Sequence, residues 1–177
     1  MLPPAPEPTP APKAAAATEA EKAARQARRD RATKEAAALA ANPAKRLDKA
    51  LNGAKSSVGT PIDIIDVEKA STLLITAKTP EGGLEGASAE DLDGAAQAIF
   101  TAVYGEADYT RSRETVVVFK GGLVNPQTGK PLRDVNTGIY TMKRGEASEI
   151  NWQDTDAVEY NIDWATYRDF AHPALKQ

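Results

Sequence analysis

The chain has 177 residues, enough for one domain together with a tail, and contains no cysteine. The missing cysteine excludes thiol nucleophiles, disulfides, iron–sulfur clusters and cysteine-ligated zinc. The net charge of −3 divides unevenly, because residues 1–57 hold 11 basic and 6 acidic side chains, a balance of +5 that leaves −8 for the rest. A basic segment beside an acidic body favours contacts with anionic surfaces, although a solvated spacer has the same composition.

The first segment of the chain is predicted to be an arm without a core. Proline stands at nearly every second position between residues 2 and 13, which is typical of extended polyproline II or disordered chain. Residues 19–41 are almost all strong helix formers, and Thr18 and Glu21 have the spacing of a capping box. No face of this helix carries large apolar side chains, so we expect it to be solvent-exposed. Its interleaved acids and lack of aromatic residues make nucleic acid a disfavoured partner.

A second, shorter helix is predicted to begin at Pro43, with Asn42 as its N-cap and Gly53 at its end. Its apolar side chains share one face that can dock on a domain: Leu47, Ala50, Leu51 and Ala54. Large apolar residues become frequent only from Val58 onward. We therefore expect residues 1–57 to form the arm and residues 58–177 to form a single compact domain.

The domain begins with strand patterns over residues 62–69 and 71–78, forming either one bent strand or two. Its clearest element is a helix over residues 88–104, which Ser88 caps and in which apolar residues recur at i, i+3, i+4 and i+7. Gly105 is expected to end this helix. A helix with such a stripe packs on a sheet.

The remainder of the domain alternates strand and helix signals less regularly. Strands are expected over 114–120, 134–143 and 157–162, with a short helix over 146–152 and a final turn after Asp163 that holds Trp164, Tyr167 and Phe170. Ile139 and Met142 are expected to be buried. The order indicates an α+β fold, a mostly antiparallel sheet with one long amphipathic helix packed on it, preceded by a disordered or helical Ala-, Pro- and Lys-rich arm. Ferredoxin-like and cystatin-like arrangements both satisfy this order.

No motif in the chain carries specific chemistry. His172 is the only histidine, so no histidine cluster can bind a metal. The glycines of residues 121–130 have the wrong spacing for a phosphate loop and are followed by Pro131. The acids of residues 154–159 lack the central glycine and twelfth-position acid of a calcium loop. We therefore assign no catalytic residue, metal ligand or cofactor, and expect a protein that is not an enzyme, although paired carboxylates can meet in a fold.

Aromatic residues are concentrated at the C-terminus, where positions 152–177 hold five of the chain's ten. Tyrosine and tryptophan are frequent anchors of interfaces. The candidate interaction residues are Trp152, Tyr160, Trp164, Tyr167 and Arg168, with Arg144 as a further member of the same patch. The competing interpretation is that the rings close one end of a small core, and it is favoured because Trp164 and Tyr167 share one helical face.

These observations predict a non-enzymatic binding module outside the cytoplasmic membrane. Proline- and alanine-rich spacers often follow a membrane or lipid anchor, as in the ectodomain of a bacterial or phage-encoded lipoprotein. No apolar run approaches the length of a membrane span, so any anchor is expected to lie outside this chain. The expected partner is a protein or a cell-envelope component. The alternative is a cytoplasmic or virion structural protein, with a native start at Met1, whose basic helical arm contacts nucleic acid or a protein.

Overall fold

The computed structural model describes residues 13–55, 59, 61–80, 87–124, 127–128 and 131–175. Its internal contacts divide the chain into two units, Met1–Asn42 and Pro43–Gln177. The proline-rich extended segment predicted for residues 2–13 lies outside the described residues, except for Lys13. Much of the loops predicted around residues 79–83 and 125–129 lies outside them as well.

The described part of the first unit forms the helix α1 (Lys13–Ala40). The helix is confirmed, but its predicted start is wrong, because it begins before the Thr18 capping box. The run of alanines at residues 14–17 explains this, since alanine is the strongest helix former. Every side chain from residue 19 to residue 38 is exposed, which confirms a solvated helix over that range. No described helix is both long and apolar enough to span a lipid bilayer.

The second unit begins with α2 (Pro43–Gly53), whose predicted apolar face is confirmed. Leu47, Ala50, Leu51 and Ala54 are all buried. They join the same core cluster as the side chains of the sheet. The short helix therefore packs within the second unit, as its amphipathic pattern predicted.

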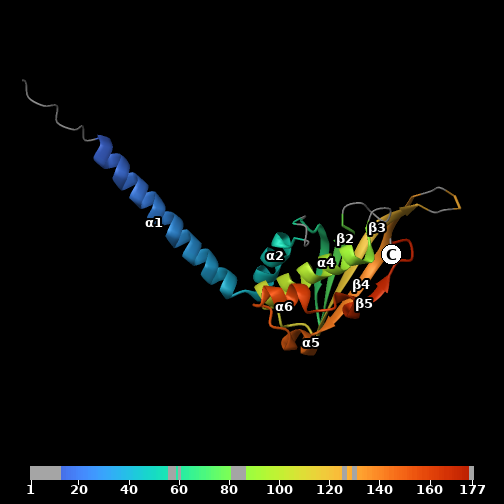
Figure 1. Ribbon diagram of the computed structural model, residues 1–177. Helices are drawn as coiled ribbons and strands as arrows, with labels where there is room; N and C mark the ends of the chain where they lie inside the picture. The colour runs from blue at the N-terminus through green and yellow to red at the C-terminus, as the bar shows by residue number, and fades with distance from the viewer. Residues whose placement is uncertain are drawn as a thin grey trace, which may run out of the picture. The chain divides into compact units, whose positions relative to one another are not determined.

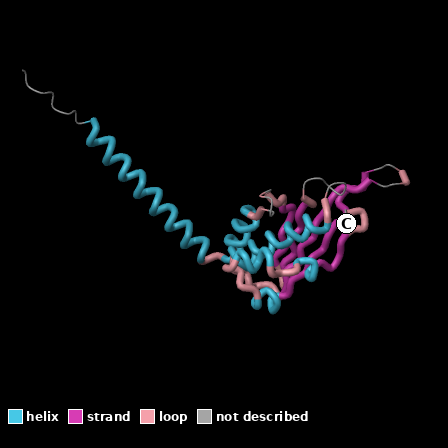
Figure 2. The backbone as a smooth tube through the Cα atoms, in the orientation of Figure 1, coloured by secondary structure: helices cyan, strands magenta, loops and turns pink. Residues whose placement is uncertain are grey.

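The second unit is built around one five-stranded sheet with the strand order β1-β2-β3-β4-β5 (Figures 1 and 2). Its strands are β1 (Ile64–Lys69), β2 (Thr72–Lys78), β3 (Glu114–Val124), β4 (Pro131–Lys143) and β5 (Arg168–Ala171). Neighbouring strands are antiparallel except β2 and β3, which are parallel. The α+β fold and the mostly antiparallel sheet are confirmed. The ferredoxin-like alternative is excluded, because β2 and β3, joined by a helix, are direct neighbours rather than a split pair.

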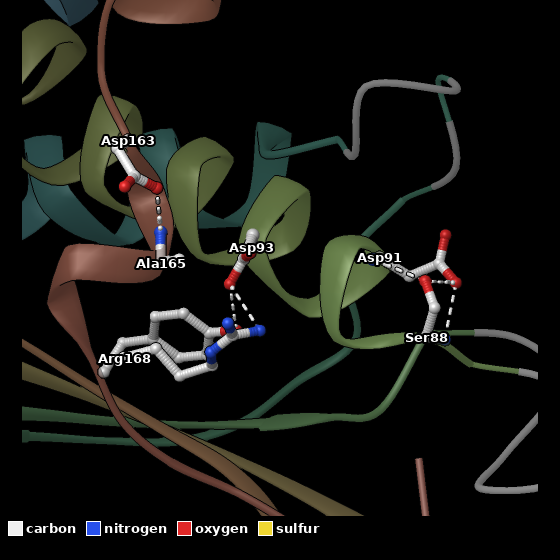
Figure 3. Close-up of polar contacts among 7 residues, drawn as sticks. Ser88, Asp91, Asp93, Asp163, Ala165 and Arg168 are labelled. Atoms are coloured by element: carbon white, nitrogen blue, oxygen red, sulfur yellow. Dashed lines mark hydrogen bonds and ion pairs between the residues drawn. The ribbon is translucent and has the colours of Figure 1, made fainter. Parts of the chain in front are cut away.

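That connecting helix is α4 (Ala89–Phe100), and its predicted cap is present. Asp91 N donates to Ser88 Oγ over 3.1 Å, and Ser88 N donates to the Asp91 carboxylate over 2.7 Å, so both halves of the capping box form (Figure 3). The helix does not stop cleanly at Gly105. It widens into a π-helical segment, η1 (Thr101–Glu106), a feature that frequently accompanies functional sites.

The core lies between α4 with η1 and one face of the sheet. Alternate strand residues point into it: Leu73, Ile75, Ala77, Val117, Phe119, Tyr140 and Met142. The prediction for Met142 is confirmed, whereas the prediction that Ile139 is buried is wrong. Ile139 is only half-buried, because its register pairs it with Val118 and Phe170 on the opposite face of the sheet.

The C-terminal region differs most from the prediction. After α5 (Arg144–Glu149), the segment expected to be a strand over residues 157–162 instead forms α6 (Thr155–Tyr160). The physical reason is a local cap, since Ala157 N donates to the Asp154 side chain over 3.0 Å and only Val158 is buried. The final turn is confirmed as the 3₁₀ helix η2 (Trp164–Tyr167), but Phe170 lies beyond it, in β5.

Gly138 in β4 allows α4 to approach the sheet closely. A Cβ atom there would lie 2.9 Å from Leu92 Cδ1 and 3.3 Å from the Tyr140 ring. We expect Gly138→Ala to lower the free energy of unfolding by about 1–3 kcal/mol through overpacking, measured by urea unfolding. Gly145→Ala in α5 is the matched control, because nothing lies within 4 Å of its Cβ position. Equal stability of the two variants would show that the close approach does not require glycine.

Candidate functional site

Two of the predicted interaction residues lie at an aromatic end of the core. Trp164 is 6% exposed, and its indole Nε1 donates to the Val158 carbonyl over 3.1 Å. Its ring stacks on Phe100 with centroids 6.1 Å apart, and Tyr167 lies 5.8 Å from it. Trp164 and Tyr167 therefore have packing partners that account for their positions.

Of the remaining candidates, Trp152 joins this aromatic group, with its ring 6.4 Å from that of Trp164, whereas Tyr160 and Arg168 lie elsewhere. Tyr160 is 74% exposed on α6, whereas Arg168 is half-buried on β5. Trp152 follows α5 and is half-buried, with its ring 5.5 Å from Tyr104. The structure thus does not bring the five predicted residues onto one surface.

Arg168 belongs to a small polar cluster with Asp93 and Tyr140. Tyr140 Oη donates to Asp93 Oδ1 over 2.6 Å, and Arg168 Nη1 lies 3.4 Å from the same oxygen. Figure 3 shows Asp93 projecting from α4 toward Arg168. Burial, together with the hydrogen bond to the Asp93 carboxylate, raises the pKa of the Tyr140 hydroxyl well above its usual value. The cluster links β4 and β5 to α4, so its contacts stabilise the packing of the helix on the sheet.

A pocket with aromatic walls lies beside the end of η1. Its volume is about 200 Å³. We call it the Arg144 pocket and define it by its main lining residues, Tyr104, Asp108, Thr110, Arg144, Ser148 and Trp152. They come from η1, from the loop after it, from α5 and from the loop after α5. The pocket therefore joins Arg144 and Trp152, two members of the interaction patch that the sequence suggested.

Hydrogen bonds fix the aromatic walls of the Arg144 pocket. Trp152 Nε1 donates to the Ala147 carbonyl over 2.8 Å, and Tyr104 Oη lies 2.8 Å from Thr115 Oγ1. Tyr104 is only 8% exposed, and burial raises the pKa of its hydroxyl. The walls are thus held in place before any ligand arrives, which lowers the entropic cost of binding.

The loop that completes the pocket turns at Asp108, which has a φ of 47°. A left-handed backbone at a non-glycine residue costs roughly 1–2 kcal/mol, and such strain is found more often at functional sites. Tyr109 N donates to the Val103 carbonyl over 2.9 Å and closes the turn. Aspartate is among the non-glycine residues that adopt this conformation most often, so Asp108 was a weak signal for the turn.

Cations gather at the rim of the pocket from two segments of the chain. Arg144 N donates to the Arg113 carbonyl over 2.8 Å, and Arg144 Nη1 donates to the Thr110 carbonyl over 3.3 Å. These bonds bring together four exposed cationic residues, namely Arg111, Arg113, Lys143 and Arg144. Acids lie among them, because Asp108 lines the pocket, Glu114 is the register partner of Lys143, and the Glu146 carboxylate accepts from Lys143 N over 2.9 Å. The rim is therefore a patch of mixed charge, and the Arg144 guanidinium is the pocket-lining group that attracts a carboxylate.

A second cleft of about 350 Å³ lies on the outer side of α4. Its charged lining residues are Lys55, Glu106 and Glu159, and small residues such as Gly94 and Ala98 form part of its lining. None of its described lining residues is aromatic. Within the described ranges, no three histidine, aspartate or glutamate side chains gather closely enough to hold a metal ion.

Comparisons of the chain with models of protein families, with curated proteins and with solved structures found no match.

Proposed function

We propose that this protein is a non-enzymatic interaction module whose Arg144 pocket receives one acidic side chain of a partner protein. The observation that carries the proposal is an exposed guanidinium at a preformed pocket walled by Trp152 and Tyr104. Arginine binds carboxylates through two parallel N–H bonds. Aromatic walls bury the aliphatic part of the entering side chain.

The size of the pocket supports a side chain rather than a free metabolite. Small-molecule sites usually enclose about 300–1,000 Å³. The Arg144 pocket, at about 200 Å³, is smaller than this range. An anchor residue inserted into such a pocket resembles the hot spots of protein interfaces, where a few buried groups supply most of the binding energy.

The polar groups of the pocket favour binding over covalent chemistry. Ser148 is the only residue of the defined pocket with a primary hydroxyl, and its Oγ donates to the Gly145 carbonyl over 2.6 Å. A nucleophilic serine needs a general base at that position, and a backbone carbonyl does not act as one. Because the Ser148 hydroxyl hydrogen is engaged by this carbonyl, recognition of the carboxylate is left to Arg144.

The arm fits this proposal as a tether. A proline- and alanine-rich segment followed by an exposed helix keeps a binding unit at a distance from an anchor, and we propose an extracytoplasmic, membrane-anchored location. Fractionation and intact mass of the native product test this. A cleaved signal or a lipid modification supports it, whereas a cytosolic product starting at Met1 contradicts it.

The second candidate function uses α1 itself. Basic side chains such as Arg25, Arg28, Arg29 and Arg31 are all exposed along it. If the arm contacts nucleic acid, affinity for a random duplex falls steeply with salt. Acids alternate with these cations, as in the pair of Glu19 and Lys22 at 3.2 Å, so this candidate ranks below the pocket.

The pocket is tested with capped tripeptides of the form Gly-X-Gly, where X is Glu, Asp, Gln or Lys. We expect the Glu and Asp peptides to shift the NMR signals of the Trp152 indole and the Ser148 amide, and the Lys peptide to leave them unchanged. Arg144→Gln should weaken peptide binding about 10- to 100-fold, the effect of losing a charge-assisted hydrogen bond.

Arg111→Gln is the matched control, because Arg111 is an exposed arginine of the same patch that does not line the pocket. It should change affinity only slightly, since an exposed charge acts mainly through the screened field. The proposal fails if the acidic peptides cause no shift, or if Arg111→Gln and Arg144→Gln weaken binding equally.

A further inference from the structure

The face of the sheet opposite α4 carries apolar side chains that are register partners on neighbouring strands. Leu74 pairs with Val116, Val118 pairs with Ile139, and Ile139 pairs with Phe170. We call these five residues, together with Thr72, Thr76 and Thr141, the open sheet face. They alternate with the buried core residues of β2, β3 and β4.

The helices α2 and α4 of the second unit lie on the other side of the sheet, where the core cluster packs (Figures 1 and 2). The residues of the open sheet face are half-buried by their own neighbours, and Phe170 remains 39% exposed. The core cluster, in contrast, fills the side covered by α4 and η1. A contiguous apolar face of this kind, with few charges at its centre, is a mark of an interaction surface.

Charges border the open sheet face on two adjoining sides. On β1, Asp66 and Glu68 are exposed and lie in register with Thr76 and Leu74, which places both acids on this face. At one end of the strands, Lys78 of β2 and Lys120 of β3 are register partners on the same face, and Lys78 also forms an ion pair with Asp63 of its own chain. At the opposite end, Glu114 and Lys143 are register partners of opposite charge. The acids of β1 thus run along the strands, and the two lysines run across one end of them.

We propose that the open sheet face binds a second copy of this chain, with the strands of the two sheets crossing at near right angles. A two-fold axis along the diagonal of the face places the acids of β1 on each copy against Lys78 and Lys120 of the other. If the strands of the two sheets were instead aligned, the acids of one copy would face the acids of the other, or the lysines of one copy would face the lysines of the other. Charge complementarity therefore selects both the second copy and the crossing.

The edges of the sheet are less suited to self-association than its face. β1 carries a bulge between Ile64 and Asp66 as well as its acidic side chains, and β5 has only four residues. Bulges, charges and short strands are the features by which proteins prevent edge-to-edge pairing. The Arg144 pocket stays free in this arrangement, because it lies beyond Lys143 at the end of the strands opposite Lys120.

Analytical ultracentrifugation of the full chain, from micromolar to near-millimolar concentration, tests the proposal. We expect the wild type to reach the mass of two chains at high concentration. Val118→Lys should keep the mass of one chain, and its circular dichroism spectrum should match that of the wild type. Gln153→Lys adds the same charge at an exposed loop position and should associate like the wild type.

Exchanging charges between the two sides of the face tests whether its partner is a second copy of this chain. Glu68→Lys and Lys120→Glu should each weaken association about tenfold, because each change places like charges at two symmetric contacts. Association should be restored in the double variant. It should also be restored in an equimolar mixture of the two single variants, because each contact between unlike copies again pairs a positive with a negative side chain. A single-chain mass at every concentration overturns the proposal, as does a mixture that associates no better than its components.

Discussion

Trp164→Ala should lower the free energy of unfolding by about 3–5 kcal/mol, the range for removing a large buried aromatic side chain. The ring is 6% exposed, stacks on Phe100 at 6.1 Å and contacts both Trp152 and Tyr167. Its removal leaves a cavity and also removes one of the two side-chain donors to the Val158 carbonyl, which then keeps only the longer bond of 3.4 Å from Gln97 Nε2. Urea unfolding followed by circular dichroism measures the loss without depending on tryptophan fluorescence.

The control for this change is Tyr160→Ala. Tyr160 is an aromatic residue of the same C-terminal region but is 74% exposed. Substitutions at such positions usually change stability by about 0.5 kcal/mol or less. If both variants unfold at the same urea concentration, the assignment of Trp164 to the core is wrong and an interaction role for its ring regains support.

The second large effect is expected from Asp93→Ala, which should cost about 2–3 kcal/mol of stability. Its carboxylate accepts the Tyr140 hydroxyl and lies 3.4 Å from Arg168 Nη1, while both charged side chains are largely buried. Removing the acid leaves a hydroxyl and a cation without their partner. Breaking one half of a buried pair is more costly than removing both halves.

A double variant provides the internal test. Asp93→Ala combined with Arg168→Leu should be more stable than Asp93→Ala alone, because the unpaired cation is gone. Asp169→Ala is the matched control, since it removes an exposed carboxylate from the same strand. A double variant that loses the sum of the two single effects would show that Asp93 and Arg168 act independently.

The elements that the sequence predicted well are those with long, local patterns. The stripe and capping box of α4 lie within one segment, as do the apolar face of α2 and the alternation in β2. α6 was mistaken for a strand because a six-residue segment with one buried residue offers no reliable period, and the Asp154 cap decides its conformation.

The polar contacts could not be predicted in the same way. The position of Asp93 near the start of α4 is explained by the helix dipole, and nothing local indicates that its partners are Tyr140 and Arg168. The Arg144 pocket was not predicted, although two of its lining residues, Trp152 and Arg144, had been suggested as members of an interaction patch. Its remaining wall depends on the left-handed turn at Asp108, a conformation for which aspartate is not diagnostic.

The parallel pairing of β2 with β3 also sets the order in which the chain can acquire its structure. Thr72 and Glu114, which face each other across this pair, are separated by 42 residues. During synthesis the apolar side of the β1–β2 hairpin therefore stays uncovered until α4 and β3 have been made. Synthesis of the intervening residues takes roughly 2–8 s at ordinary elongation rates. Both hairpins become stable only when this central ladder closes, so a chain interrupted before β3 exposes Leu73 and Ile75 to chaperones and proteases.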